Sequence, residues 1–129
     1  MQKIVIFLLT LTLIGCASAP TEEQLQNADY GNYQSPNDCV RLAEARIKST
    51  LKDPTSAIFS HSSCMTGYAP KVPLMGLPVE FGYWQNGTVN AKNSFGGYVG
   101  SRKYDVLIRN GRVVRWCVAD ENGICMPSR

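Results

Sequence analysis

Histidine is almost missing from this sequence, since His61 is the only one among 129 residues. A hydrolase built on a Cys–His pair needs a free thiolate beside the imidazole. Cys64 lies three residues further on, and in a strand an odd offset directs two side chains to opposite faces. We therefore predict no catalytic residues, and we interpret His61 as a histidine at the surface or at a sheet edge.

Closely paired cysteines are also lacking, because no two of the five cysteines form a C-x₂-C pair. That spacing is typical of zinc sites, so metal binding by four thiolates is the weaker alternative here. The sequence has no phosphate-binding G-x-x-x-x-G-K-[ST] motif either, although Gly96-Gly97 lies near Lys92, Arg102 and Lys103. We interpret this glycine pair as a plain turn and expect neither a metal nor a cofactor.

An excess of one charge is absent, since 13 Lys and Arg stand against 10 Asp and Glu. Removing residues 1–15 takes away only Lys3, which leaves 12 against 10. A nearly neutral chain lacks the positive field of most nucleic-acid-binding proteins. We expect no nucleic-acid partner.

The apolar run from Ile4 to Ile14 is too short for a transmembrane helix, which needs about twenty residues. It follows the positive Lys3 and ends at a small residue, Gly15, and these are the parts of a secretory signal peptide. We assign residues 1–15 to such a signal.

The segment Leu13-Ile14-Gly15-Cys16 resembles the lipobox of bacterial lipoproteins. The resemblance implies cleavage before Cys16, a diacylglycerol on its thiol, and an anchor of acyl chains such as palmitate. Ala17 in place of aspartate implies the outer membrane, facing the periplasm, if the source is Gram-negative. An ordinary signal peptide with a chance cysteine, or an uncleaved anchor, is the alternative.

The remaining cysteines are even in number, which in an exported chain predicts two disulfides rather than free thiols. A helix ending at Pro54 and a strand starting at Ala57 would bring Cys39 level with Cys64 if the two pack antiparallel. Cys125 follows Cys117 by eight residues with Asn122-Gly123 between them. The predicted pairs are Cys39–Cys64 and Cys117–Cys125.

The chain past the signal divides into a flexible, lipid-anchored tether, residues 16–35, and a small α+β domain, residues 36–129. In the domain we expect one N-terminal helix on a small antiparallel sheet. Ser35 and Pro36 predict the start of the helix, and Pro54 its end. Its apolar stripe is Val40, Ala43, Ile47 and Leu51.

We expect strands over residues 57–64 and 79–91, separated by an unusually apolar loop, 67–78, and a final hairpin over 98–119. Asn110-Gly111 predicts a two-residue type I′ turn. In that register Tyr104 faces Cys117, Leu107 faces Val114, and Cys117 points to the core. A bulge at Gly111 would instead swap the faces.

Two segments, Lys52-Asp53-Pro54-Thr55-Ser56-Ala57 and Asn90-Ala91-Lys92-Asn93-Ser94-Phe95-Gly96-Gly97-Tyr98, resemble motifs of a group of small bacterial secreted proteins and lipoproteins. The resemblance covers roughly residues 38–115. It implies a short helix that ends in the first motif and a hairpin that carries the second, and it brings no known activity.

Basic residues crowd the final hairpin, with aromatic residues between them. A solvated sheet edge is the simpler interpretation. The sharper hypothesis is a contact surface for an acidic partner, made of Arg109, Arg112, Arg115 and Trp116. Under either interpretation we expect replacement of the three arginines to change stability by no more than about 1 kcal/mol, because exposed charges contribute little to folding.

The sequence predicts a lipoprotein that acts by binding, as an accessory or scaffold of an envelope complex, with an envelope protein or cell-wall polymer as its partner. One alternative is an exclusion or inhibitor lipoprotein of a mobile element, with the apolar loop around Leu74 as a plug. The other is an envelope enzyme, which would need acidic residues such as Asp105 and Glu80 to converge.

Overall fold

The computed structural model describes residues 18–129, so the signal peptide, the lipobox and Cys16 lie outside the described residues. The helices are α1 (Glu22–Gln26) and α2 (Pro36–Lys48), with two short 3₁₀ turns, η1 (Pro54–Ser56) and η2 (Pro73–Met75). The strands are β1 (Ile58–His61), β2 (Met65–Ala69), β3 (Glu80–Asn90), β4 (Arg102–Arg109) and β5 (Arg112–Val118). Among the described residues, no helix is both long and apolar enough to cross a membrane.

One antiparallel sheet of five strands forms the body of the protein, in the order β1-β3-β4-β5, and β2 also pairs with β3. The predicted strand over 57–64 contains only β1, and a second strand, β2, begins at Met65 and takes the first three residues of the predicted loop 67–78, so that part of the loop prediction is wrong. The two strands lie end to end along the long strand β3. Gln85 lies at the break between them. Its buried side chain donates to the carbonyl of Ser62 at 2.7 Å, which satisfies a group that strand pairing leaves free.

Helix α2 begins where the sequence predicts, because the Ser35 hydroxyl accepts a hydrogen bond from the Asp38 amide at 3.1 Å. It ends at Lys48, six residues or nearly two turns before the predicted stop at Pro54. The hydroxyls of Ser49 and Thr50 donate to the carbonyls of Arg46 and Ile47, at 2.6 and 2.7 Å. These bonds satisfy the last carbonyls of the helix, so the chain turns before the proline.

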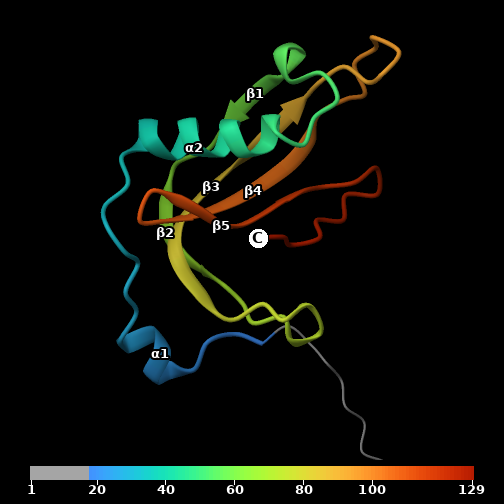
Figure 1. The fold of residues 1–129 in the computed structure, drawn as a ribbon. Coiled ribbons are helices and arrows are strands. Elements are labelled where there is room, and N and C mark those ends of the chain that lie inside the picture. Colours follow the sequence, from blue (N-terminus) through green and yellow to red (C-terminus); the bar gives the residue numbers. More distant parts are fainter. Residues whose placement is uncertain (1–17) are drawn as a thin grey trace, which may run out of the picture.

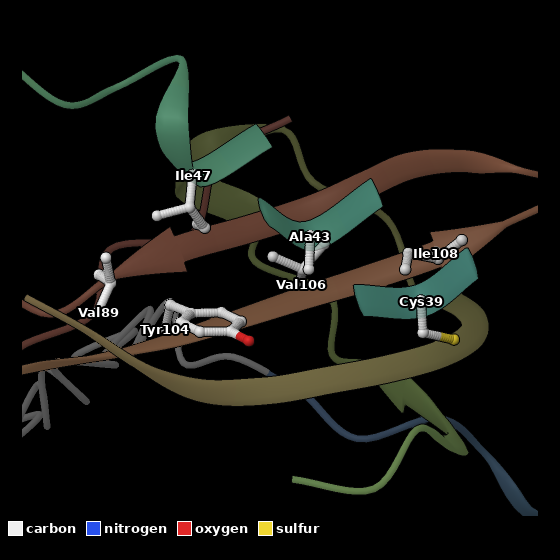
Figure 2. Packing of buried hydrophobic residues seen from close by; sticks show 7 residues of the cluster. All are labelled: Cys39, Ala43, Ile47, Val89, Tyr104, Val106 and Ile108. Atoms are coloured by element: carbon white, nitrogen blue, oxygen red, sulfur yellow. The ribbon is translucent and has the colours of Figure 1, made fainter. Parts of the chain in front are cut away.

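The core lies between α2 and one face of the sheet (Figure 2). The buried stripe of α2 is Cys39, Ala43 and Ile47, so Cys39 belongs to the core as its place beside the predicted stripe suggested. The sheet contributes Val89, Tyr104, Val106 and Ile108. The expected fold of a helix on an antiparallel sheet is thus confirmed for the described residues.

Both predicted disulfides are present. Cys39 is bonded to Cys64, with their Cα atoms 6.2 Å apart, and ties the first turn of α2 to the break between β1 and β2. Cys117 is bonded to Cys125, with their Cα atoms 5.4 Å apart, and ties the C-terminal segment to β5.

The final hairpin has the predicted two-residue turn, since Asn110 and Gly111 both have positive φ, 51° and 72°. The predicted register holds for only the first two pairs, because β5 has an irregularity opposite Leu107 and Ile108. Beyond it, Leu107 faces Arg115 and Tyr104 faces Val118, so the predicted partners Val114 and Cys117 are wrong.

This one-residue shift exchanges the two faces of β5. Trp116 and Val118 pack against the core beneath α2. Arg115 and Cys117 alternate with them and are buried on the other side of the sheet. The prediction that Cys117 points to the core beneath α2 is therefore also wrong.

The segment expected to be a tether makes several contacts with the domain. Asp29 pairs with Arg109 at 2.8 Å, and the rings of Tyr30 and Tyr33 lie edge-on to Phe81 and Tyr83. Its short helix α1 is closed by a capping box between Thr21 and Gln24. Residues 18–35 therefore follow one side of the sheet toward the first turn of α2 (Figure 1).

Candidate functional site

The two motifs that carry the resemblance touch each other in the structure. The Lys92 amide donates to the Ser56 hydroxyl at 2.8 Å, and the Tyr98 hydroxyl donates to the Ser56 carbonyl at 3.1 Å. Ser56 also donates to the carbonyl of Asp53, which closes η1. The turn after α2 and the loop between β3 and β4 thus form one unit.

Asn93 organises the tip of that loop. Its side-chain oxygen accepts from the amides of Phe95 and Gly97, at 2.9 and 3.1 Å. Gly96 has φ of 80°, a conformation that glycine adopts without strain. The loop is therefore a closed turn, and the plain turn predicted at Gly96-Gly97 is confirmed.

The tip displays apolar side chains to solvent. Phe95 is 96% exposed, the highest value among the large apolar side chains that the structure describes, and Tyr98 and Val99 are about half exposed. A phenyl ring held in solvent on a closed turn gains nothing for folding, since it buries almost no area. We call Phe95, Tyr98 and Val99 the apolar tip.

A cleft of about 400 Å³ lies beside the apolar tip, between the end of β3 and the chain after α2. Its apolar lining includes Leu51, Val89 and Val118. Three cations surround it, Lys52, Lys92 and Arg102, against one lining acid, Asp120. The Asp120 carboxylate accepts two backbone amides of its own turn, and Arg102 lies 3.9 Å from the exposed Glu121. Lys52 and Lys92 therefore supply the excess positive charge at the rim.

The alternative of a phosphate cradle at Gly96-Gly97 finds no support in this geometry. The amides of Phe95 and Gly97 point to Asn93, and the Gly96 amide donates to the Asn93 carbonyl at 3.1 Å. An anion bound there would need these donors free.

The four residues predicted as a basic contact surface lie in different environments. Arg112 is exposed, whereas Arg109 is half-buried and paired with Asp29. Trp116 is half-buried, with the Arg46 guanidinium 5.8 Å above its ring. Arg115 is only 2% exposed, so the expectation that it belongs to an exposed surface is wrong. The bulge in β5 places it on the face of the sheet away from α2, where it is buried.

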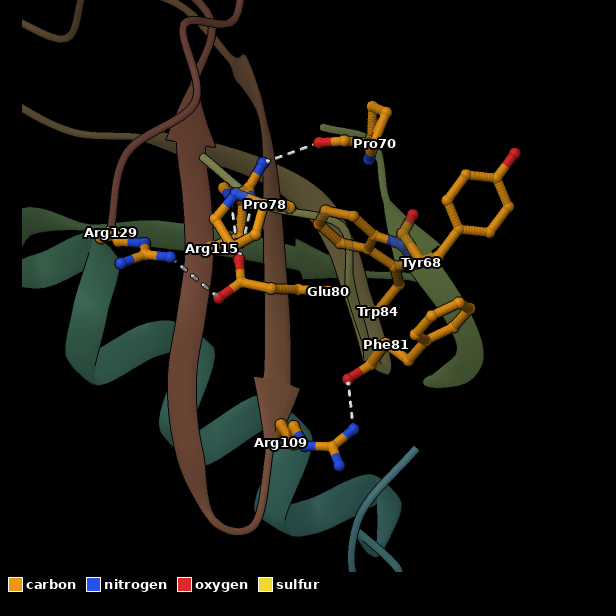
Figure 3. Close-up of polar contacts among 9 residues, drawn as sticks. All are labelled: Tyr68, Pro70, Pro78, Glu80, Phe81, Trp84, Arg109, Arg115 and Arg129. Atoms are coloured by element: carbon orange, nitrogen blue, oxygen red, sulfur yellow. Dashed lines mark hydrogen bonds and ion pairs between the residues drawn. The ribbon is translucent and has the colours of Figure 1, made fainter. Parts of the chain in front are cut away.

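Arg115 is held by three acceptor groups on the far side of the sheet, the carboxylate of Glu80 and two backbone carbonyls (Figure 3). Its guanidinium contacts Glu80 at 2.7 Å, and it donates to the carbonyls of Pro70 and Pro78 at 3.2 and 2.7 Å. Arg129 lies 3.7 Å from the other oxygen of Glu80. A buried charge with such partners is a structural element that positions the loop between Pro70 and Pro78.

His61 belongs to a chain of polar groups that no pattern in the sequence indicates. Its Nε2 lies 3.0 Å from Glu44 of α2, and its Nδ1 lies 2.6 Å from the Tyr104 hydroxyl. Burial is the main cause that raises the pKa of Tyr104 to about 12, so its hydroxyl stays protonated. Because Tyr104 is fully buried, this chain ties α2 to the sheet and offers no hydroxyl to a substrate.

The acids singled out from the sequence do not form a joint site. Asp105 lies opposite Asn86, six residues along β3 from Glu80, or about 20 Å. Asp105 is within 4.0 Å of the sulfurs of Cys117 and Cys125, but disulfide sulfurs are poor metal ligands. Burial raises the pKa of Asp105 above its ordinary value.

A scan against protein families, a search of curated proteins and a search of solved structures each found no significant match for this chain.

Proposed function

We propose that this protein is an envelope lipoprotein that acts by binding, as an accessory or scaffold of an envelope complex. Cys16 would carry the acyl anchor in the outer membrane, with the domain facing the periplasm, as the lipobox implies. The observation that carries the binding role is the apolar tip, an ordered turn that holds Phe95 almost entirely in solvent. Such a surface is typical of protein–protein contact sites.

The position of the tip relative to the anchor supports this proposal. Ser18, two residues after Cys16, pairs with Lys71, which follows the end of β2, where Ala69 pairs with Glu80 at the start of β3. The tip lies in the loop that follows the other end of β3. An eleven-residue strand is about 33 Å long. Figure 1 places the blue segment that follows residue 18 and the orange segment that carries the tip at opposite ends of the molecule. The tip would therefore face away from the membrane, where a partner can reach it.

The chemistry of the site indicates the kind of partner. The apolar tip and the lining of the cleft would receive aromatic or aliphatic side chains, and the cations at its rim would pair with carboxylates. We infer that the partner presents an acidic segment with apolar anchors. The hairpin surface around Arg112 and Trp116 is a second candidate for contact with the partner. Arg115 is no longer part of it, because that side chain is buried.

The test is site-specific photo-crosslinking of the full lipidated protein in its own envelope, with the photoreactive residue at position 95. We expect one dominant crosslinked protein, and we expect Val99→Ser to weaken that product. Tyr33 is 76% exposed on another part of the surface and is the matched control position. The same product at equal yield from position 33 would contradict the binding role of the tip.

Anchoring is tested separately with Cys16→Ser. We expect loss of acyl labelling and loss of tight membrane association. A variant that keeps its acyl label and stays with membranes through a carbonate wash would refute the lipobox interpretation without bearing on the tip.

A further inference from the structure

A short loop between β2 and β3 is hydrogen-bonded to Ser18, the first residue that the structure describes. The Ser18 amide donates to the Lys71 carbonyl at 3.0 Å, and the Lys71 amide donates to the Ser18 carbonyl at 3.1 Å. Two residues span at most about 7 Å, so Cys16 is within that reach of Ser18 in any conformation. We call residues 71–77 the anchor-side loop.

Backbone hydrogen bonds within the anchor-side loop, and a buried arginine at its two ends, hold the loop in one conformation. Val72 and Leu77 exchange backbone hydrogen bonds of 2.8 and 3.1 Å, and η2 closes on Gly76, whose φ is 64°. The carbonyls on either side of the loop, those of Pro70 and Pro78, both accept from the buried Arg115 (Figure 3). The loop is therefore fixed to the sheet at both ends.

This rigid loop turns apolar side chains outward. Leu77 is buried, but Leu74 is 85% exposed, the most exposed large aliphatic side chain that the structure describes, and Met75 is 43% exposed. Holding Leu74 outward on a fixed turn does not help the fold, since that side chain buries little area. Contact with an apolar surface outside the domain would bury the side chains of Leu74 and Met75.

We propose that the anchor-side loop is a membrane-contact site, which inserts Leu74 and Met75 into the bilayer interface beside the acyl chains. The proposal rests on the anchoring at Cys16 proposed above. The bilayer is the favoured occupant, because an acyl chain on Cys16 would bring the lipid surface within two residues of the loop.

The charges around the loop define the kind of contact. Lys71 is the one cation within residues 71–77, while Glu22 and Glu23 follow Ser18 by only four and five residues. Attraction to anionic headgroups is therefore weak, and the contact is mainly apolar. Two contacts with the membrane, the anchor and the loop, would fix the orientation of the domain. The strand β3 would then lead away from the membrane, with the apolar tip at its far end.

The test uses the full lipidated protein in vesicles of phosphatidylethanolamine and phosphatidylglycerol, with and without brominated acyl chains, which quench tryptophan inside the bilayer. Two variants each add one tryptophan to the native pair, Leu74→Trp at the loop and Phe95→Trp at the tip. Both positions are highly exposed, so neither change should disturb the fold. Flotation of the vesicles records anchoring independently of fluorescence.

We expect the added emission of Leu74→Trp to shift to the blue and to be lost in brominated vesicles, and that of Phe95→Trp to stay unchanged. If both variants float and Leu74→Trp is not quenched, the membrane contact is refuted while the anchor stands. Quenching of Phe95→Trp alone would show the reverse orientation and refute it too. Failure of the wild-type protein to float would remove the anchoring, and the contact with it.

Discussion

The two ends of β3 carry exposed apolar residues, but their supports differ. Before the strand, the anchor-side loop is held by the Arg115 guanidinium, which is buried among carbonyls and Glu80. After the strand, the apolar tip is held by the side chains of Asn93 and Ser56, which are neutral and close to solvent.

The difference in burial sets how far a disturbance spreads. A buried charge that loses its partner imposes a desolvation cost on the whole folded state. A neutral hydrogen bond near solvent can be replaced by water, so its loss is local. We therefore expect the anchor-side loop to be coupled to global stability and the tip to be an independent, adjustable element.

The largest effect should come from Arg115→Met. It leaves Glu80 partly buried with only Arg129 nearby, so we expect the free energy of unfolding to fall by about 3–5 kcal/mol. Urea unfolding of the mature protein measures it, with the exposed Arg112→Gln as the control, within about 0.5 kcal/mol of wild type. If the free energy of unfolding falls by less than about 1 kcal/mol, the expectation from the sequence holds for Arg115, and the anchor-side loop is not coupled to global stability.

Loss of either disulfide should have the next largest effect on the free energy of unfolding. Replacing Cys39 and Cys64 with serine opens a closure of 25 residues and should lower the free energy of unfolding by about 3.5 kcal/mol. Replacing Cys117 and Cys125 opens one of 8 residues and should cost about 2.5 kcal/mol.

The second pair also bears on Arg115, because it holds the C-terminal segment that carries Arg129. A double-mutant cycle between Arg115→Met and the Cys117/Cys125 replacement should therefore be non-additive. The same cycle with the Cys39/Cys64 replacement is the comparison. Equal coupling in the two cycles would show that the C-terminal segment does not support the anchor side.

At the tip, Asn93→Ala should cost only about 1 kcal/mol, since it removes neutral hydrogen bonds near solvent. Hydrogen exchange at the amides of Phe95 and Gly97 should accelerate, while exchange in β4 stays unchanged. Ser94→Ala, in the same turn, is the control. Faster exchange throughout the sheet would mean that the tip is coupled to the fold after all.

The smallest effect concerns Asp105, beside the second disulfide. Burial raises its pKa above the ordinary value of 3.8, although Lys103 acts in the opposite direction. The folded protein thus binds this proton more tightly than the unfolded chain, and stability falls as the pH rises through the raised pKa. We expect Asp105→Asn to melt above wild type at pH 7 and level with it below about pH 3.8.

The exposed Glu121 provides the control for that comparison, since Glu121→Gln should change the melting temperature little at pH 7. A lower melting temperature for Asp105→Asn at pH 7 would mean that the charged carboxylate stabilises the sheet, contrary to the direction of its pKa.

Local signals in the sequence determined several features correctly. The cap at Ser35, the turn at Asn110-Gly111, the turn at Asn93 and both disulfide pairs each depend on residues close in sequence or on simple lengths of helix and strand. The lipobox and residues 1–15 are likewise sequence predictions, and they lie outside the described residues. These features can be predicted because their physics is local.

Only the tertiary structure decided on which face of the sheet Arg115 lies, and with it the support of the anchor-side loop. One extra residue in β5 moved Arg115 and Cys117 to one face and Trp116 to the other, and nothing near them in the sequence marks the bulge. The polar chain through His61, the contact between the two motifs and the pairing of Ser18 with Lys71 join residues distant in sequence. Strand register and long-range pairing are set by the packing of the whole sheet, and a side chain changes face when the register shifts by one residue.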